Sequence, residues 1–331
     1  MWEWWSSRPQ HCLKFGTESL GWAERAGGWR GQRRSRCVTA TLPNGVINPS
    51  LRDPNVSDLS AVADCIRSLT QSARVSRRSA KAFRSGLPRR VTILIPDTAV
   101  RTTVLSFEQL PTSWQERDDL IRWRLGQEQL VPINGAKIVS QIFPDDGAGG
   151  SGVYTALTVS IQEAVLHQYE SLCESVGLIP CDVGVTSLRL LDFWRHTSNR
   201  SGWLRRNVFW VTVSDRALTT IVCQGRRPIF YRCKLLGGDG ADGLNNPDVL
   251  HRVLEECAAS LEACHQRHPS VTIDQAVICA EEEASALREH MEGELHLAVE
   301  QLDWKSVESL GWIAKGSHPG LTSLAALAGL S

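Results

Sequence analysis

Hydrophobic and polar residues follow the same order in two stretches of the chain. In each stretch, three short runs with strand-like composition precede a longer segment in which apolar residues recur every three or four positions, as in an amphipathic helix. The first stretch contains CLKFG (12–16), SLGWAERA (19–26), RCVTATL (36–42) and a helix at 57–72. The second contains NVFWVTV (207–213), ALTTIVC (217–223), PIFYRCKL (228–235), a helix at 247–267, the strand TIDQAVICA (272–280) and a helix near 281–291. The chain therefore repeats an order of elements, although not a sequence.

A different pattern lies between these stretches. VTILIPDTAV (91–100) and RTTVLSF (101–107) are strand-like, a helix is predicted at about 114–130, and KIVSQIFP (137–144) and VYTALTVS (153–160) are again strand-like. A helix to about 176 follows, and CDVGVTSLRLLDFW (181–194) reads as a strand that enters a helix. We interpret residues 91–177 as a small α+β subdomain inserted into the first half.

Three antiparallel strands, a helix, and then a strand and a helix form the unit of a ribonuclease H-like fold. Two such units facing each other give an actin-like α/β architecture, which is the predicted fold class. The predicted organisation is a polar, Trp-rich tail (1–10), a first actin-like subdomain (11–90 with 178–200), the inserted subdomain (91–177) and a second actin-like half (204–331).

Charge changes this picture little. The chain has 36 Lys and Arg against 36 Asp and Glu, but residues 1–100 hold 16 basic against 7 acidic residues. Such a basic region favours phosphates, anionic lipid or an acidic partner, although a solvated face is the plainer interpretation. A nucleic-acid-binding module is not expected, because aromatic–basic stacking motifs and a reading helix are both missing. No apolar run reaches the roughly 20 residues of a membrane span, and no secretion signal is evident.

The cysteines indicate a reducing environment. Ten are present without a CxxC pair, which in a chain of 331 residues is typical of reduced, mostly buried thiols in the cytosol. Cys257, Cys264, His265 and His268 form a group near the end of a predicted helix, but their spacing matches no zinc pattern. We therefore expect no metal site.

Several segments together resemble the PilM family of actin-like proteins from type IV pilus biogenesis, relatives of the division protein FtsA. The similarity runs almost from end to end. It rests on G-x-x-x-x-G-W-A-E (16–24), LPNGVINPS (42–50), ILIPDTAVRTTVLSFEQLP (93–111), LIRWRLGQEQLVP (120–132), PCDVGVTSLRLL (180–191), GRRPIFYRCKLLGG (225–238) and HPGLTSLAALAGLS (318–331).

The resemblance implies a nucleotide pocket between the halves, in which carboxylates orient the waters of Mg²⁺ beside the phosphates. The family's first Asp falls on Lys14 and its second on Thr212, so both expected carboxylates are missing. The remaining positions of this degenerate pocket are Gly16, Thr17, Gly21, Ser214, Gly237 and Gly238. We expect no catalytic residues, no enzyme activity and no resident cofactor.

Two alternatives leave the binding of ATP, with or without Mg²⁺, open. Asp215, three positions beyond Thr212, is a candidate displaced acid, and Lys14 is a candidate cation in place of Mg²⁺. The family's glycine-rich adenosine loop falls on AEEEAS (280–285), where side chains oppose close backbone approach and glutamates would repel a triphosphate. A divergent ATPase or phosphotransferase is thus the alternative function. Asp97, in IPD at 95–97, is interpreted as a residue that caps a turn.

The resemblance also implies a partner. It predicts a cytoplasmic scaffold of the pilus or of a related secretion machine, peripheral at the inner membrane, that binds the tail of a bitopic PilN-like protein. The assembly or retraction ATPases are further candidate partners. An extended peptide would add main-chain hydrogen bonds in a groove beside the inserted subdomain. The candidate groove residues are Ile95, Val104, Leu105, Ile121, Trp123 and Pro132.

Twelve tryptophans are many for this length. Four lie inside predicted elements and are expected in the core: Trp22, Trp123, Trp194 and Trp210. Trp2, Trp4 and Trp5 lie in the polar tail, where docking on the fold, insertion at a bilayer interface and binding of a partner all remain open.

Overall fold

The computed structural model describes residues 9–26, 34–72, 89–128, 134–144, 153–197, 206–237, 243–280, 284–304, 307, 313–315 and 320–330. Several sequence predictions lie outside these residues, among them those for Trp2, Trp4, Trp5, Pro132, Gly238 and the glutamates at 281–283.

The first half is built on a sheet of strand order β14-β3-β2-β1-β4-β8. The three strands β1, β2 and β3 are antiparallel to one another, whereas β4 runs parallel to β1, and β8 runs parallel to β4. The bounds are β1 His11–Phe15, β2 Ser19–Ala26, β3 Arg34–Thr41, β4 Arg89–Ile95, β8 Leu178–Val185 and β14 Ile313–Lys315.

The second half repeats this arrangement in the order β11-β10-β9-β12-β13. The strands β9, β10 and β11 are antiparallel to one another, whereas β12 runs parallel to β9, and β13 runs parallel to β12. The bounds are β9 Asn207–Ser214, β10 Ala217–Gln224, β11 Arg227–Leu235, β12 Gln275–Ala280 and β13 Ala298–Gln301. The predicted pair of ribonuclease H-like halves is thus confirmed.

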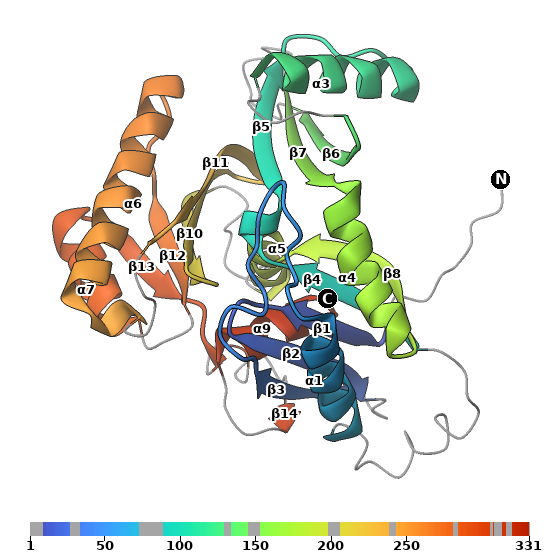
Figure 1. Ribbon diagram of the computed structural model, residues 1–331. Helices are drawn as coiled ribbons and strands as arrows, with labels where there is room; N and C mark the ends of the chain where they lie inside the picture. Colours follow the sequence, from blue (N-terminus) through green and yellow to red (C-terminus); the bar gives the residue numbers. More distant parts are fainter. Residues whose placement is uncertain are drawn as a thin grey trace.

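Helices form layers on both sides of each sheet (Figure 1). The outer face of the first sheet packs on α1 (Leu59–Ser72) and α4 (Glu163–Ser175), while α6 (Pro247–Arg267) and α7 (Ser285–Glu294) cover the far face of the second. Between the sheets lie α5 (Thr186–Thr197) and α9 (Leu321–Ala328), in one apolar cluster that draws residues from both halves.

The inserted subdomain is an antiparallel sheet of order β5-β7-β6 with one helix. Its bounds are β5 Arg101–Phe107, α3 Trp114–Glu128, β6 Ala136–Pro144 and β7 Tyr154–Gln162. Leu105, Ala156 and Ile138 on one face of the sheet pack with Ile121 and Leu125 of α3. Figure 1 shows the subdomain projecting from the first half, with α3 across its outer end.

Two predicted boundaries differ from the structure. The insertion was expected to span 91–177, but β4 lies inside the first sheet and α4 packs on that sheet. The strands β4 and β5 are both apolar and only the short 3₁₀ turn Asp97–Ala99 separates them, so hydrophobicity alone does not reveal that the chain changes sheets there.

The end of the chain also returns to the first half. Residues 204–331 were expected to form the second half, yet β14 pairs with β3, and α9 packs against β1, β2 and β3. Gly21 makes this packing possible, because a Cβ there would lie 2.7 Å from the carbonyl oxygen of Thr322. A side chain at Gly21 would push α9 away from the sheet.

Candidate functional site

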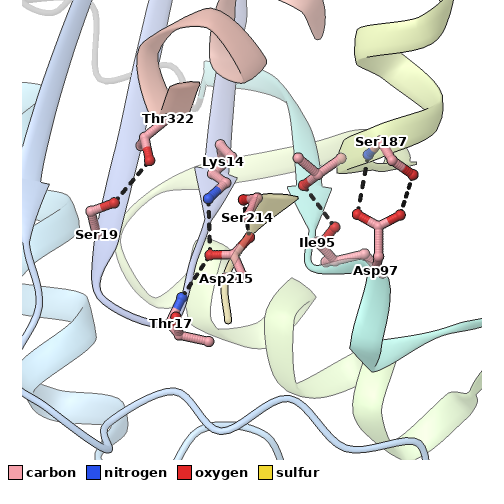
Figure 2. A network of polar contacts seen from close by, with 10 residues as sticks. Lys14, Thr17, Ser19, Ile95, Asp97, Ser187, Ser214, Asp215 and Thr322 are labelled. Carbon is pink, nitrogen blue, oxygen red and sulfur yellow. Dashed lines mark hydrogen bonds and ion pairs between the residues drawn. The ribbon is translucent and has the colours of Figure 1, made fainter. Parts of the chain in front are cut away.

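Two hairpin tips, one from each half, meet at the centre of the molecule. The β1–β2 hairpin of the first half turns at 16–18, and the β9–β10 hairpin of the second half turns at Asp215 and Arg216. Lys14 Nζ lies 3.0 Å from Asp215 Oδ1 across the interface, and the exposed fractions of the two side chains are 0% and 6% (Figure 2). The site is therefore a buried ion pair that joins the two halves.

The Asp215 carboxylate accepts further hydrogen bonds. The backbone N–H of Thr17 donates to Oδ1 at 3.0 Å, and the Ser214 hydroxyl donates to Oδ2 at 3.0 Å. Both oxygens are thus engaged, and donors come from both halves. A buried carboxylate requires such partners, because removing its charge from water is otherwise very costly.

Local backbone geometry places these groups. Asp215 and Arg216 have φ of 53° and 59°, and Ser214 pairs with Ala217 across the turn, which is typical of a two-residue type I′ hairpin. Asp is among the few non-glycine residues that readily adopt positive φ. On the opposite side, a Cβ at Gly16 would lie 2.5 Å from Asp215 Oδ1 and 2.6 Å from Lys14 Nζ. Glycine therefore lets the two tips approach.

A second ion pair joins the same tips at the surface. The guanidinium of Arg216 lies 2.8 Å from Glu18 Oε1, and the two side chains are 39% and 50% exposed. Arg216 also donates to Asn44 Oδ1 at 3.4 Å. Because water and salt screen exposed pairs, this contact contributes at most about 1 kcal/mol to stability.

Asp97 forms another polar connection between the halves. It follows β4, and its carboxylate accepts hydrogen bonds from the backbone N–H of Ser187 at 3.1 Å and from the Ser187 hydroxyl, at the first turn of α5 (Figure 2). Tyr231 of β11 donates its hydroxyl to the same carboxylate at 2.9 Å. Burial raises the pKa of Asp97, and the hydrogen bonds from Ser187 and Tyr231 oppose that rise.

The sequence suggested that Asp97 caps its own turn, but its side chain does not do so. It binds the N-terminus of a helix 90 residues further on and a strand of the other half. Sequence reasoning missed this connection because its members are far apart and follow no motif spacing.

The predicted pocket residues separate into two groups. Lys14, Gly16, Thr17 and Ser214 converge on Asp215. The others have different surroundings: Thr212 accepts a hydrogen bond from the Trp210 indole at 2.7 Å, Gly21 faces α9, and the Gly237 carbonyl accepts from Arg252 at 2.9 Å.

The predicted groove residues do not line one surface. Ile95 is buried in the core of the first half, while Leu105 and Ile121 are buried in the core of the inserted subdomain. A groove lined by these three side chains is therefore a wrong prediction. Trp123, expected in the core, is 59% exposed. It lies two positions from both Ile121 and Leu125, and residues so spaced on a helix point to different faces.

A different apolar surface lies on the face of the inserted sheet opposite α3. Strand pairing aligns Val104 with Leu157, and Val159 with Val139. Side chains alternate along a strand, so these residues face away from the core that contains Leu105, Ala156 and Ile138. Val139 is 57% exposed, and Val104 and Leu157 are partly exposed, whereas Val159 packs against the core of the first half.

Most of the thiols are buried. All ten cysteines are free, and burial raises the pKa of Cys37 and of Cys257 to about 12. Cys257 and Cys264 pack in the core of the second half. Among the residues that the structure describes, no group of three or more His, Cys, Asp and Glu side chains is arranged to hold a metal ion. Within the same residues, no helix is both long and apolar enough to cross a membrane.

Comparisons with known proteins identify the fold. No family model matches the sequence, and no curated protein is significantly similar to it. A chain of the PilM-PilN type IV pilus biogenesis complex is similar in structure, with a TM-score of 0.69 and 15% identity over 96% of this chain and 98% of that one. The cytoplasmic domain of EpsL, an inner membrane component of the type II secretion system of Vibrio cholerae, aligns with a TM-score of 0.48 and 8% identity over 96% and 94%. MreB5 of Spiroplasma citri, bound to ADP, aligns with a TM-score of 0.41 and 8% identity over 98% of this chain and 95% of that one.

The likeness to the chain of the PilM-PilN complex, with its TM-score of 0.69, shows that this chain has the actin-like ATPase fold. The resemblance to PilM drawn from the sequence is confirmed at the level of the fold, over nearly the whole of both chains. The inserted subdomain is included in that match, since the alignment covers 96% of the residues.

Proposed function

We propose that this protein is an actin-like scaffold of a type IV pilus or related secretion machine, and that it binds the cytoplasmic tail of a bitopic inner-membrane protein. It would act in the cytoplasm and associate with the membrane through that partner. The observation that carries the proposal is the full-length likeness to a chain of a complex that contains PilN. Fold alone does not give function, so the binding surface must be tested directly.

The surface that we propose for the tail is the exposed apolar face of the inserted sheet. Val139, Leu157 and Val104 lie on it, and β6 forms one edge of the sheet. An edge strand offers backbone N–H and C=O groups, and an extended peptide can pair with them while its apolar side chains contact the adjacent face. This surface replaces the groove that the sequence suggested.

Fluorescence anisotropy tests the proposal with labelled peptides that cover the cytoplasmic tails of the bitopic pilus or secretion proteins from the same genome. We expect one tail to bind saturably. Val139→Glu should weaken that binding at least about tenfold, which corresponds to about 1.4 kcal/mol, because it places a charge on the docking face. Val139 is largely exposed, so the substitution should leave the fold intact.

Trp123→Glu is a matched control. Trp123 has nearly the same exposed fraction as Val139 and lies in the same subdomain, but on the solvent side of α3. It should leave the affinity unchanged. Loss of binding in Trp123→Glu but not in Val139→Glu would move the site to α3, and no binding by any tail would refute the scaffold function.

A divergent ATPase or phosphotransferase is the second candidate, favoured by the carboxylate of Asp215 between the two halves. Against it, that carboxylate is already bonded to Lys14 and Thr17. We propose that the protein has no need of nucleotide. Isothermal titration with ATP and Mg²⁺ should give no saturable heat, and metal-dependent binding at micromolar concentration would favour the enzyme.

A further inference from the structure

The Asp215 carboxylate lies in surroundings that suit a bound oxyanion. An ammonium group, a backbone N–H beside a glycine and a hydroxyl converge on it: Lys14 Nζ, Thr17 N and Ser214 Oγ, each at 3.0 Å. Cations and backbone amides at a tight glycine turn are the usual ligands of phosphate and carboxylate groups in proteins. Two of these three donors belong to the first half, whereas the carboxylate belongs to the second.

We propose that Asp215 is a built-in anion, whose carboxylate fills an oxyanion site formed by Lys14 and Thr17 and thereby holds the two halves together. The chain then supplies both charges of the contact, the cation from β1 and the anion from the β9–β10 turn. This goes beyond the proposed function and does not depend on the binding of any partner tail.

Burial makes this role testable. Lys14 is fully buried, and a charge there is costly unless an opposite charge lies beside it. If the carboxylate is removed, the ammonium group and the Thr17 N–H lose their shared acceptor. A small oxyanion from solution can then take the vacated place, because it presents the same type of oxygen to the same donors.

The experiment measures thermal unfolding of the full chain carrying Asp215→Gly, with and without inorganic phosphate. Glycine suits the backbone, since φ at this position is 53°. We expect the substitution to lower Tm by about 5 °C or more, on the scale that relates stability to Tm for chains of this size. Phosphate should then raise Tm of the variant saturably by a few degrees, through binding to the folded state alone.

Four controls separate a specific site from a general salt effect. Sodium chloride at matched ionic strength should not reproduce the rise. Wild-type protein should not respond to phosphate, because its site is already filled. The double variant Lys14→Met/Asp215→Gly should not respond either, because it lacks the cation. Glu18→Gln removes only the exposed pair at the same tips, so phosphate should leave its Tm unchanged, as in wild type.

Equal phosphate effects in wild type, Asp215→Gly and the double variant would overturn the proposal. So would an unchanged Tm in Asp215→Gly. If Asp215→Gly does not fold, Asp215→Asn provides the test, because Asn tolerates this backbone and keeps one acceptor but lacks the charge. Its Tm should lie below that of wild type, because the buried Lys14 ammonium loses its counter-charge, and a Tm equal to that of wild type would refute the built-in anion.

Discussion

The β1–β2 and β9–β10 hairpins occupy the same place in their halves, yet their tips carry opposite chemistry. Lys14 pairs with Gly21 in the first hairpin. Thr212, which the resemblance to PilM aligns with Lys14, pairs with Thr219 in the second. The first tip contributes a cation and a backbone N–H, while the second contributes a carboxylate on a tight turn. Two copies of one framework thus become complementary partners.

The same pair of positions explains where the last helix lies. Gly21 leaves room for α9 on the first sheet, whereas the second sheet carries the buried Thr219 at the equivalent place. Apolar alternation is repeated in both halves, because it builds the sheets. The few small and polar residues on the inner faces differ, and they decide what lies between the halves.

Lys14→Met should have the largest effect on stability. It leaves the Asp215 carboxylate buried without its cation, and breaking a buried ion pair in this way costs about 3–5 kcal/mol. Urea unfolding at equilibrium measures the loss. A change below about 1 kcal/mol would show that water reaches the carboxylate, and that the two tips are not complementary partners.

Tyr231→Phe tests a second buried polar contact between the halves, that of Tyr231 with Asp97, through its pH dependence. In the range between the usual carboxyl pKa near 4 and the raised pKa of Asp97, the folded state binds more protons than the unfolded state, so stability falls as pH rises. The Tyr231 hydroxyl favours the charged form of Asp97. In Tyr231→Phe, stability should therefore fall more steeply as pH rises. The difference in the free energy of unfolding between wild type and variant should grow from pH 4.5 to pH 7, toward about 1.5–3 kcal/mol.

Urea unfolding series at several pH values would show this divergence. The pKa of Tyr231 itself is raised well above its usual value, so the phenol does not titrate in the range. A difference that stays constant with pH would mean that Tyr231 does not influence the charge of Asp97.

Gly21→Ala sharpens the comparison of the two inner faces. The added Cβ would lie 2.7 Å from the carbonyl oxygen of Thr322, so either α9 or β2 must move, at a cost of about 1–3 kcal/mol. Gly293→Ala in α7 is the matched control, because nothing lies within 4 Å of its Cβ. Alanine there should be neutral or stabilise by up to about 1 kcal/mol, through helix propensity. Equal effects would show that Gly21 does not set the position of α9.

The sequence predicted the repeated framework because apolar periodicity acts locally and is strong in every strand. It also placed Lys14, Gly16, Thr17 and Ser214 at one site, through the resemblance to PilM. From the sequence, Asp215 and Lys14 were interpreted separately, as a displaced acid and as a cation in place of Mg²⁺. Their contact joins residues 201 positions apart, and nothing in either local sequence specifies it.

In the inserted subdomain, the sequence did not predict which side chains are exposed. Its elements were predicted, but the side chains exposed on it were not, because exposure depends on which face of each element meets the core. Trp123 is apolar and helical but lies on the solvent side. The boundary at β4 was wrong for a related reason, since a buried strand has the same composition in either sheet.

Glu18→Gln should have the smallest effect. It removes the charge from the exposed pair with Arg216, which connects the same two tips as Lys14 and Asp215 but is open to water. Exposed ion pairs contribute about 0.2–1 kcal/mol, and salt screens them further. Unfolding in urea at low and high sodium chloride should show a small loss that disappears with salt. A loss as large as that of Lys14→Met would mean that the surface pair, and not the buried one, holds the two tips together.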